Sequence, residues 1–151
     1  MVKAIKEAQK LLGVKFNYDK ENNLFSSGFE LGTRIEEGLL CIFITEEMQL
    51  TTINCDYHYE ISEAKKSDIL EYIARVNNNI LKGNFLYDFE TNSPSYQFTM
   101  FSIKDPELIA YEINRVINDV IVFSDGFVEV NEDGVTPEEA VNKIYQRLDE
   151  E

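Results

Sequence analysis

The 151-residue chain contains 44% hydrophobic residues, with ten Phe and eight Tyr, which is enough to build a core and excludes wholesale disorder. Its 14 basic and 28 acidic residues give a formal net charge of −14, and so negative a surface disfavours nucleic acids and anionic lipid surfaces as partners. Two Cys, one His and no Trp exclude a disulfide framework and most catalytic constellations.

The first part of the chain predicts a helix followed by an antiparallel meander. Val2–Leu12 has apolar residues at helical spacing, and Gly13 stands where a glycine ends such a helix. Apolar and polar residues then alternate with the period of two that is typical of strands. The predicted strands cover residues 14–18, 24–31, 39–45 and 48–59.

The second part predicts a helix, two strands and two further helices. Apolar spacing over residues 62–83 indicates a helix of about 20 residues, with Ser62 as N-cap and Gly83 as its end. Aromatic strands are predicted at 85–89 and 96–101. A helix then starts at Pro106, and its end is left open by the pattern. A capping box at residues 136–139 starts the last helix.

Adjacent strands joined by short turns predict an antiparallel sheet with helices covering one face. We therefore expect one α+β domain over residues 1–151, in the order α-βββ(β)-α-ββ-α-α. No apolar run approaches the ~20 residues of a membrane helix. Lys3, Lys6 and Lys10 interrupt the apolar stretch that a signal peptide would need, so a cytoplasmic protein is expected.

One sequence pattern occurs twice. Phe-x-Tyr-Asp-x-Glu-x-Asn starts at Phe16 and again at Phe85, each time shortly after a helix that a glycine is expected to end. Two explanations are open: an old duplication, or convergence of alternating aromatic residues and a polar turn. Both predict a hairpin at each position.

Two segments resemble the YbjN family of bacterial proteins. Residues 77–100 combine an Asn-rich helix end, a glycine, an aromatic strand with Asp and a tyrosine strand, and residues 134–141 read Gly-Val-Thr-Pro-Glu-Glu-Ala-Val. The family is described as proposed sensory transduction regulators, and it shares the fold of type III secretion chaperones, which are commonly dimeric. The resemblance implies a non-enzymatic role in binding other proteins.

The residues that could carry chemistry are few. His58 shares a strand face with Asp56, and Glu46 or Glu47 could approach from the preceding turn. Such a cluster could bind a metal or act as a general base, but one His in an acidic chain fits a surface strand histidine better. No glycine pattern for phosphate binding occurs, and we expect no cofactor and no metal.

Two further features have structural interpretations. Cys41 and Cys55 fall on neighbouring strands in diagonal positions, and we expect a reduced pair of small core residues. The segments at residues 125–126 and 131–134 resemble fragments of calcium loops. They lack the regular ligand spacing and the closing glutamate, so both are predicted to be turns.

The strand at residues 96–101 supplies the candidate contact surface. One of its faces continues as Gln97, Thr99, Phe101 and Ile103, a mixed set rather than a polar one. Helices on one side of a sheet cannot cover both faces, so these four residues are candidate partner contacts. The alternative is that Phe101 and Ile103 tuck under a helix end.

Three functions are compatible with the sequence. We expect a protein-interaction module without enzymatic activity, a regulator or chaperone-like adaptor. It would form a homodimer or bind a protein partner through a sheet face or edge. The alternative is a small-ligand-binding domain with an aromatic-lined pocket between helices and sheet. An enzyme is the third possibility, with Asp56 and His58 as its only candidate site.

Overall fold

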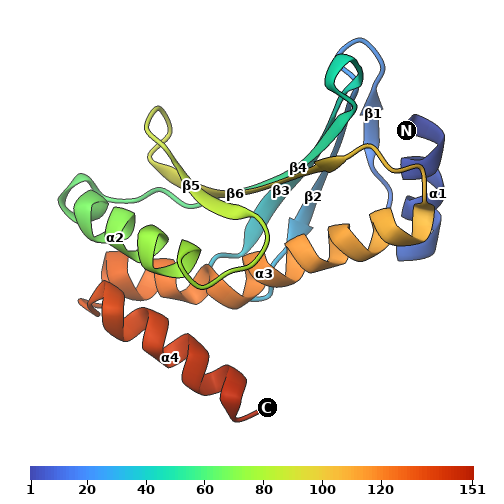
Figure 1. Ribbon diagram of the computed structural model, residues 1–151. Coiled ribbons are helices and arrows are strands. Elements are labelled where there is room, and N and C mark those ends of the chain that lie inside the picture. The colour runs from blue at the N-terminus through green and yellow to red at the C-terminus, as the bar shows by residue number, and fades with distance from the viewer.

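A twisted six-stranded antiparallel sheet carries all four helices on one face in the computed structural model, which describes residues 1–151 (Figure 1). The strands follow the order β1-β2-β3-β4-β6-β5. They are β1 (Asn17–Asp19), β2 (Leu24–Glu30), β3 (Glu37–Thr45), β4 (Leu50–Tyr57), β5 (Asn84–Asp88) and β6 (Ser93–Phe101). The helices are α1 (Val2–Leu12), α2 (Lys66–Asn77), α3 (Pro106–Glu132) and α4 (Pro137–Asp149), with 3₁₀ helices η1 (Glu46–Met48) and η2 (Glu63–Lys65). The predicted α+β class and one-sided helix layer are confirmed.

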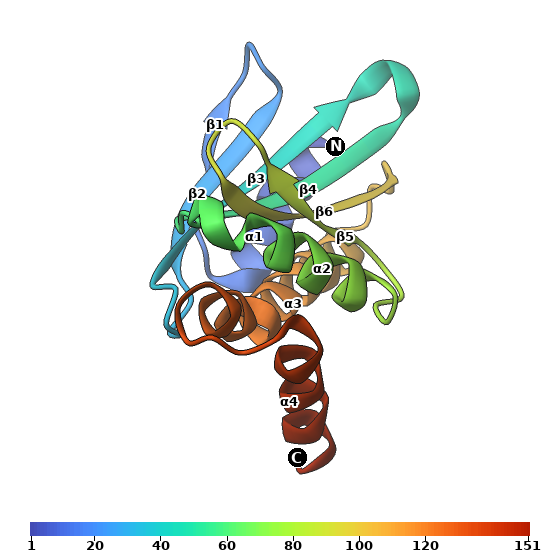
Figure 2. The same cartoon turned by 90° about the vertical axis from the view of Figure 1, so that its left-hand side faces the viewer.

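Helix α3 runs along the whole sheet and forms the centre of the core (Figures 1 and 2). Two buried tyrosines anchor it: the hydroxyl of Tyr57 donates to the carbonyl oxygen of Val120 at 2.5 Å, and that of Tyr72 donates to the carbonyl oxygen of Phe123 at 2.8 Å. Phe127 lies between the two rings, with centroid distances of 5.3 and 4.8 Å. Because buried hydroxyl groups need partners, these bonds also fix where α3 lies along the sheet.

The expected turn at Asp125-Gly126 is wrong, because both residues lie inside α3, which is 27 residues long and ends at Glu132. A Cβ atom built on Gly126 would lie 2.1 Å from Oη of Tyr72. The glycine is therefore there for the close approach of the Tyr72 ring, and it does not break the helix. The other predicted turn, at residues 131–134, does end a helix. Helix α3 stops at Glu132, and Gly134 follows with φ 68°.

The helix expected over residues 62–83 is shorter than predicted, because α2 has 12 residues and ends at Asn77. The Asn77 side chain donates from Nδ2 to the carbonyl oxygen of Phe85 at 3.0 Å and accepts from its backbone N–H at 2.8 Å. Asn79 donates to the carbonyl oxygen of Arg75 at 2.9 Å and so satisfies a helix-end acceptor. Asparagine side chains thus compete with the helical hydrogen bonds and turn the chain into β5.

The repeated sequence pattern forms the same hairpin turn at both edges of the sheet. In each copy an Asn adopts φ 52° and accepts a hydrogen bond from the hydroxyl of the Tyr five residues earlier, at 3.3 Å in the first copy and 3.2 Å in the second. In each copy an Asp carboxylate accepts two backbone N–H groups of the turn. The residues are Tyr18, Asp19 and Asn23 in the first copy and Tyr87, Asp88 and Asn92 in the second. Both predicted hairpins are confirmed.

Candidate functional site

The face of the sheet opposite the helices, which we call the outer face, bears three of the four predicted contact residues. Gln97 and Thr99 are exposed on it, and Phe101 is 75% exposed. Ile103 lies beyond the end of β6, in the connection to α3, and is 47% exposed. The expectation that Ile103 continues the strand is therefore wrong, and so is the alternative that Phe101 and Ile103 tuck under a helix end.

Apolar side chains gather at one end of the outer face, beside the β3–β4 turn. Leu24 lies directly opposite Phe43, and Leu50 lies directly opposite Phe101. Phe43 pairs with Thr52, which places Leu50 diagonally across from it, and diagonal neighbours in a sheet are within reach of aromatic side chains. These four residues, which we call the apolar end, run from β2 to β6.

The middle of the outer face is polar and uncharged. One row across the sheet is formed by residues that pair in register: Ser26, Cys41, Asn54, Gln97 and Asn84. In the neighbouring row the hydroxyls of Thr52 and Thr99 are 2.9 Å apart. Hydroxyl and amide groups can both donate and accept hydrogen bonds, so these two rows are suited to bind a polypeptide backbone.

The opposite end of the outer face is acidic. Glu30 and Glu37 are directly opposite each other on β2 and β3, an arrangement of like charges that destabilises a sheet. Asp56 and Asp88 add carboxylates on β4 and β5. We call these four residues the acidic end.

The six strands contain no Lys and no Arg. Their charged residues are all acidic, and all are on the outer face: Asp19, Glu30, Glu37, Asp56 and Asp88. The basic residues of the chain lie in the helices and connections. Four of these five carboxylates form the acidic end, whereas Asp19 lies opposite Leu24, beside the apolar end.

His58 lies at the acidic end, and its acidic neighbour is Glu37 rather than the predicted Glu46 or Glu47. Its Nδ1 is 3.7 Å from Oε2 of Glu37, and its side chain is 55% exposed. Glu46 and Glu47 are in η1, at the other end of β4, so the expectation that they approach His58 is wrong. No three or more His, Cys, Asp or Glu side chains group in a way that could hold a metal ion.

The two cysteines are on opposite faces of the sheet. Cys41 pairs with Asn54 and Cys55 pairs with Leu40, and consecutive strand residues point to opposite sides. Both cysteines are free and buried, as expected. Cys55 belongs to the main core cluster, whereas Cys41 is buried on the outer face. Burial raises the pKa of both thiols, which keeps them protonated at neutral pH.

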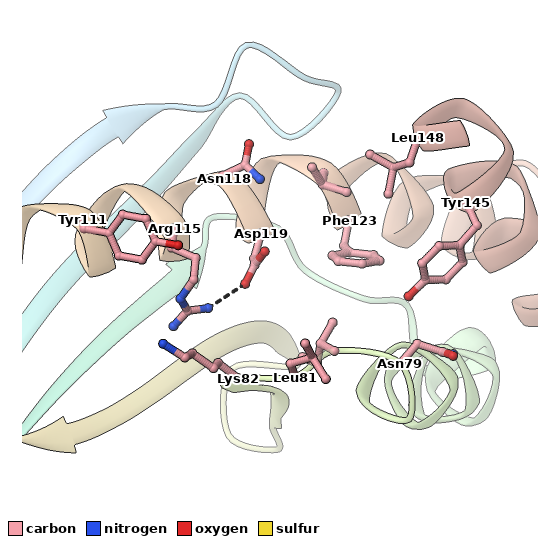
Figure 3. Close-up of a pocket in the computed structure, with 12 residues that line it drawn as sticks. Asn79, Leu81, Lys82, Tyr111, Arg115, Asn118, Asp119, Phe123, Tyr145 and Leu148 are labelled. Atoms are coloured by element: carbon pink, nitrogen blue, oxygen red, sulfur yellow. Dashed lines mark hydrogen bonds and ion pairs between the residues drawn. The ribbon is translucent and has the colours of Figure 1, made fainter. Parts of the chain in front are cut away.

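A cavity of about 420 Å³ opens on the helical side, between the α2–β5 connection, α3 and α4 (Figure 3). Its aromatic lining comes from Tyr111, Phe123 and Tyr145, and Leu81 at its rim is fully exposed. The volume is in the range of small-ligand sites. However, the sheet does not line it, in contrast to the pocket predicted between helices and sheet.

The polar groups at one end of this cavity are paired with one another. Arg115 donates to Glu112 at 2.6 Å and to Asp119 at 3.0 Å, and Lys82 donates to Glu112 at 2.8 Å. The hydroxyl of Tyr96 donates to Asp119 at 2.8 Å, and burial raises the pKa of Tyr96 to about 12. Nη2 of Arg115 is buried without a hydrogen-bond partner, but the other charged groups here are paired. The cavity therefore offers a ligand few free charged partners, and the outer face is the stronger candidate site.

Comparison with solved structures identifies the fold. The chain matches YbjN from E. coli, a proposed transcription regulator, with a TM-score of 0.60 and 10% identity over 80% of this chain and 86% of that chain. The fold is the predicted YbjN-like, chaperone-like fold. A chain of the ExsC–ExsE complex matches with a TM-score of 0.56 and 11% identity, over 78% of this chain and 85% of that chain. A chain of the HopA1–SchA chaperone–effector complex matches with a TM-score of 0.55 and 8% identity, over 85% of this chain and 92% of that chain.

Sequence comparison finds one relative in an archaeon. The uncharacterized protein MJ1285 of Methanocaldococcus jannaschii is 31% identical over 91 residues, which are 57% of this chain and 47% of that protein. The chain thus spans about half the length of this relative. No family model matches the chain. None of the helices combines the length and the apolar character needed to cross a membrane.

Proposed function

We propose that this chain is a non-enzymatic protein-interaction module, a regulator or chaperone-like adaptor related to the YbjN family, which binds a protein through the outer face. The observation that carries the proposal is the uncovered apolar end, where Phe43 is 40% exposed and Phe101 is 75% exposed. All four helices lie on the other face of the sheet (Figures 1 and 2).

The composition of the outer face supports binding of protein. Exposed apolar patches rimmed by polar groups mark interaction sites, and aromatic side chains near the centre of an interface contribute most of its binding energy. The apolar end supplies such side chains, and the neighbouring row supplies hydroxyl and amide groups for hydrogen bonds with a partner. A second copy of the chain or another protein could provide the complementary surface.

The structural neighbours support the same role. Two of them, ExsC–ExsE and HopA1–SchA, were solved as complexes of two proteins. We infer that residues 1–151 act as one domain in this role, because one sheet and one cluster of 32 buried hydrophobic residues extend through the chain.

Site-specific cross-linking in the native cell tests the proposal. A photoreactive phenylalanine analogue placed at Thr99 on the outer face is expected to capture a discrete protein, whereas the same group at Asn142, exposed on α4, is not. Light scattering on the purified protein, a chain of 17.5 kDa, shows whether a second copy is bound. The proposal fails if Thr99 captures no more than Asn142 and the protein is a monomer.

A further inference from the structure

We infer that the outer face takes a cationic, amphipathic polypeptide segment, with apolar side chains on the apolar end and Lys or Arg side chains on the acidic end. The inference rests on the proposed function and specifies the chemistry of the partner. The observations that carry it are the charges of the strands, the spacing between the two ends and the self-repulsion that a second copy would meet.

The charge of the outer face points to a basic partner. Five carboxylates and no Lys or Arg project from the strands on this face. Glu30 and Glu37 directly oppose each other, and the only basic neighbour is His58, 3.7 Å from Glu37. A cationic side chain between the two glutamates would replace repulsion by attraction, and complementary charge of this kind sets specificity and association rate.

The distance between the two ends sets the size of the segment. Phe43 and Glu37 lie on the same strand and the same face, six residues apart, which is about 20 Å at the rise of a strand. An extended segment of about six residues or a helix of about 13 residues covers that distance. The segment therefore carries its apolar and basic side chains at its two ends, with the polar middle row beneath its centre.

The same charges argue against a second copy on this face. Packing two copies face to face with their acidic ends together would bring four carboxylates of each copy into one interface, with no Lys or Arg from any strand to pair with them. Like charges brought together across an interface are strongly unfavourable. A homodimer of this chain would therefore use another surface, or an arrangement that keeps the acidic ends apart.

Binding of a designed probe tests the inference. The probe is a fluorescent peptide of about nine residues, long enough to span the face when extended, with Leu-Phe-Leu at one end, Gly-Ser-Gly in the middle and Lys-Arg-Lys at the other. Two matched peptides carry Glu in place of the basic residues or Ser in place of the apolar ones. Fluorescence anisotropy is expected to show binding of the first peptide only. Binding should weaken at ~1 M salt, where the screening length falls to about 3 Å.

Charge-matched variants locate the site. Glu30→Gln with Glu37→Gln changes the net charge by the same amount as Glu7→Gln with Asp149→Asn, two exposed helix residues. The outer-face pair is expected to weaken binding about tenfold and the helix pair less than about twofold, because surface charges off the site act only at long range. Phe101→Ser should also weaken binding, whereas Leu81→Ser, which removes a fully exposed leucine on the helical side, should not. Equal losses in the two charge pairs, or equal binding of the Glu peptide, would overturn the inference.

The inference and the proposed function can fail separately. If Phe101→Ser turns a dimer into a monomer in light scattering, the outer face holds a second copy; the cationic partner is then wrong, but the interaction role stands. If Thr99 captures a protein in cells and the first peptide does not bind, only the inference fails. If neither cross-linking, peptide binding nor self-association involves the outer face, both are wrong.

Discussion

The ring of Tyr72 on α2 lies so close to Gly126 on α3 that a Cβ atom at position 126 would be 2.1 Å from its Oη and 2.5 Å from its Cζ. The Tyr72 hydroxyl donates a hydrogen bond to the carbonyl oxygen of Phe123, one turn before the glycine in α3. A glycine inside a helix costs about 1 kcal/mol relative to alanine. The contact between α2 and α3 therefore depends on a residue that is unfavourable for α3 itself.

Replacing Gly126 by Ala should lower the free energy of unfolding by about 1–3 kcal/mol, because forcing atoms into a packed core outweighs the gain in helix propensity. Urea unfolding followed by circular dichroism measures the change. Asn114→Ala, at an exposed position of the same helix, is the control and should stay within about 0.5 kcal/mol of the unmodified protein. A Gly126→Ala protein as stable as the control would show that Tyr72 does not pack there in solution.

Replacing Asn77 by Ala should lower the free energy of unfolding by about 1–3 kcal/mol, because the backbone N–H and carbonyl groups of Phe85 lose their partner. Phe85 is only 1% exposed, so water cannot readily replace the side chain. Asn78→Ala is the matched control, since Asn78 is exposed and adjacent. Equal stability of the two variants would contradict the role given to Asn77.

The sequence predicts the strands and their faces well, because alternation in a strand directly reports which side chains share a face. The β4 pattern placed Thr51, Ile53, Cys55 and Tyr57 together, and these are its buried residues. Helix ends are harder, because apolar spacing does not register hydrogen bonds from side chains. Ile80 and Leu81 fit the helical stripe, yet α2 ends at Asn77 and Leu81 is fully exposed.

The candidate site could be predicted only in part. Gln97, Thr99 and Phe101 follow from alternation within one strand, whereas the apolar end needs the register that places Leu24 opposite Phe43. That register depends on tertiary structure. The absence of Lys and Arg from all six strands is visible in the sequence once the strands are assigned, and it is the signal that could have located the acidic end.

Glu112 gives a prediction about pH. Burial alone would raise the pKa of this carboxyl, but the hydrogen bonds from Lys82 and Arg115 outweigh it, and the pKa lies below its ordinary value of 4.5. A carboxylate with a lowered folded-state pKa stabilises the native protein above its unfolded pKa, and this contribution is lost as the pH falls through the folded pKa. Asp119 acts in the opposite direction, because burial raises its pKa.

We therefore expect Glu112→Gln to be less stable than the unmodified protein at neutral pH, with a difference that narrows as the pH falls from about 6 to about 3. Urea unfolding across this pH range measures the difference. Glu107→Gln, an exposed position on the same helix, controls for the change in net charge. A difference in the free energy of unfolding that stays constant with pH would contradict the lowered pKa of Glu112.

The two thiols should differ in accessibility. Cys41 is 7% exposed on the outer face and Cys55 is 0% exposed in the core. A thiol reagent should label Cys41 first in the native protein and reach Cys55 only after unfolding. Cys41→Ser and Cys55→Ser variants assign the two phases. Equal labelling rates would contradict the placement of the two cysteines on opposite faces of the sheet. If the probe peptide with Lys-Arg-Lys at one end binds the outer face, it should slow the labelling of Cys41 only.

The order of the strands has a consequence for the speed of folding. Every pairing in the sheet joins strands that are consecutive in the chain except β4–β6, which joins residues 50–56 to 95–101. Closing so long a loop costs more chain entropy than closing a hairpin. The two halves of the sheet can thus form locally, and their joining should limit the refolding rate. Substitutions at Ile53 or at its partner Phe98 should slow refolding, whereas substitutions in the β1–β2 turn should mainly accelerate unfolding.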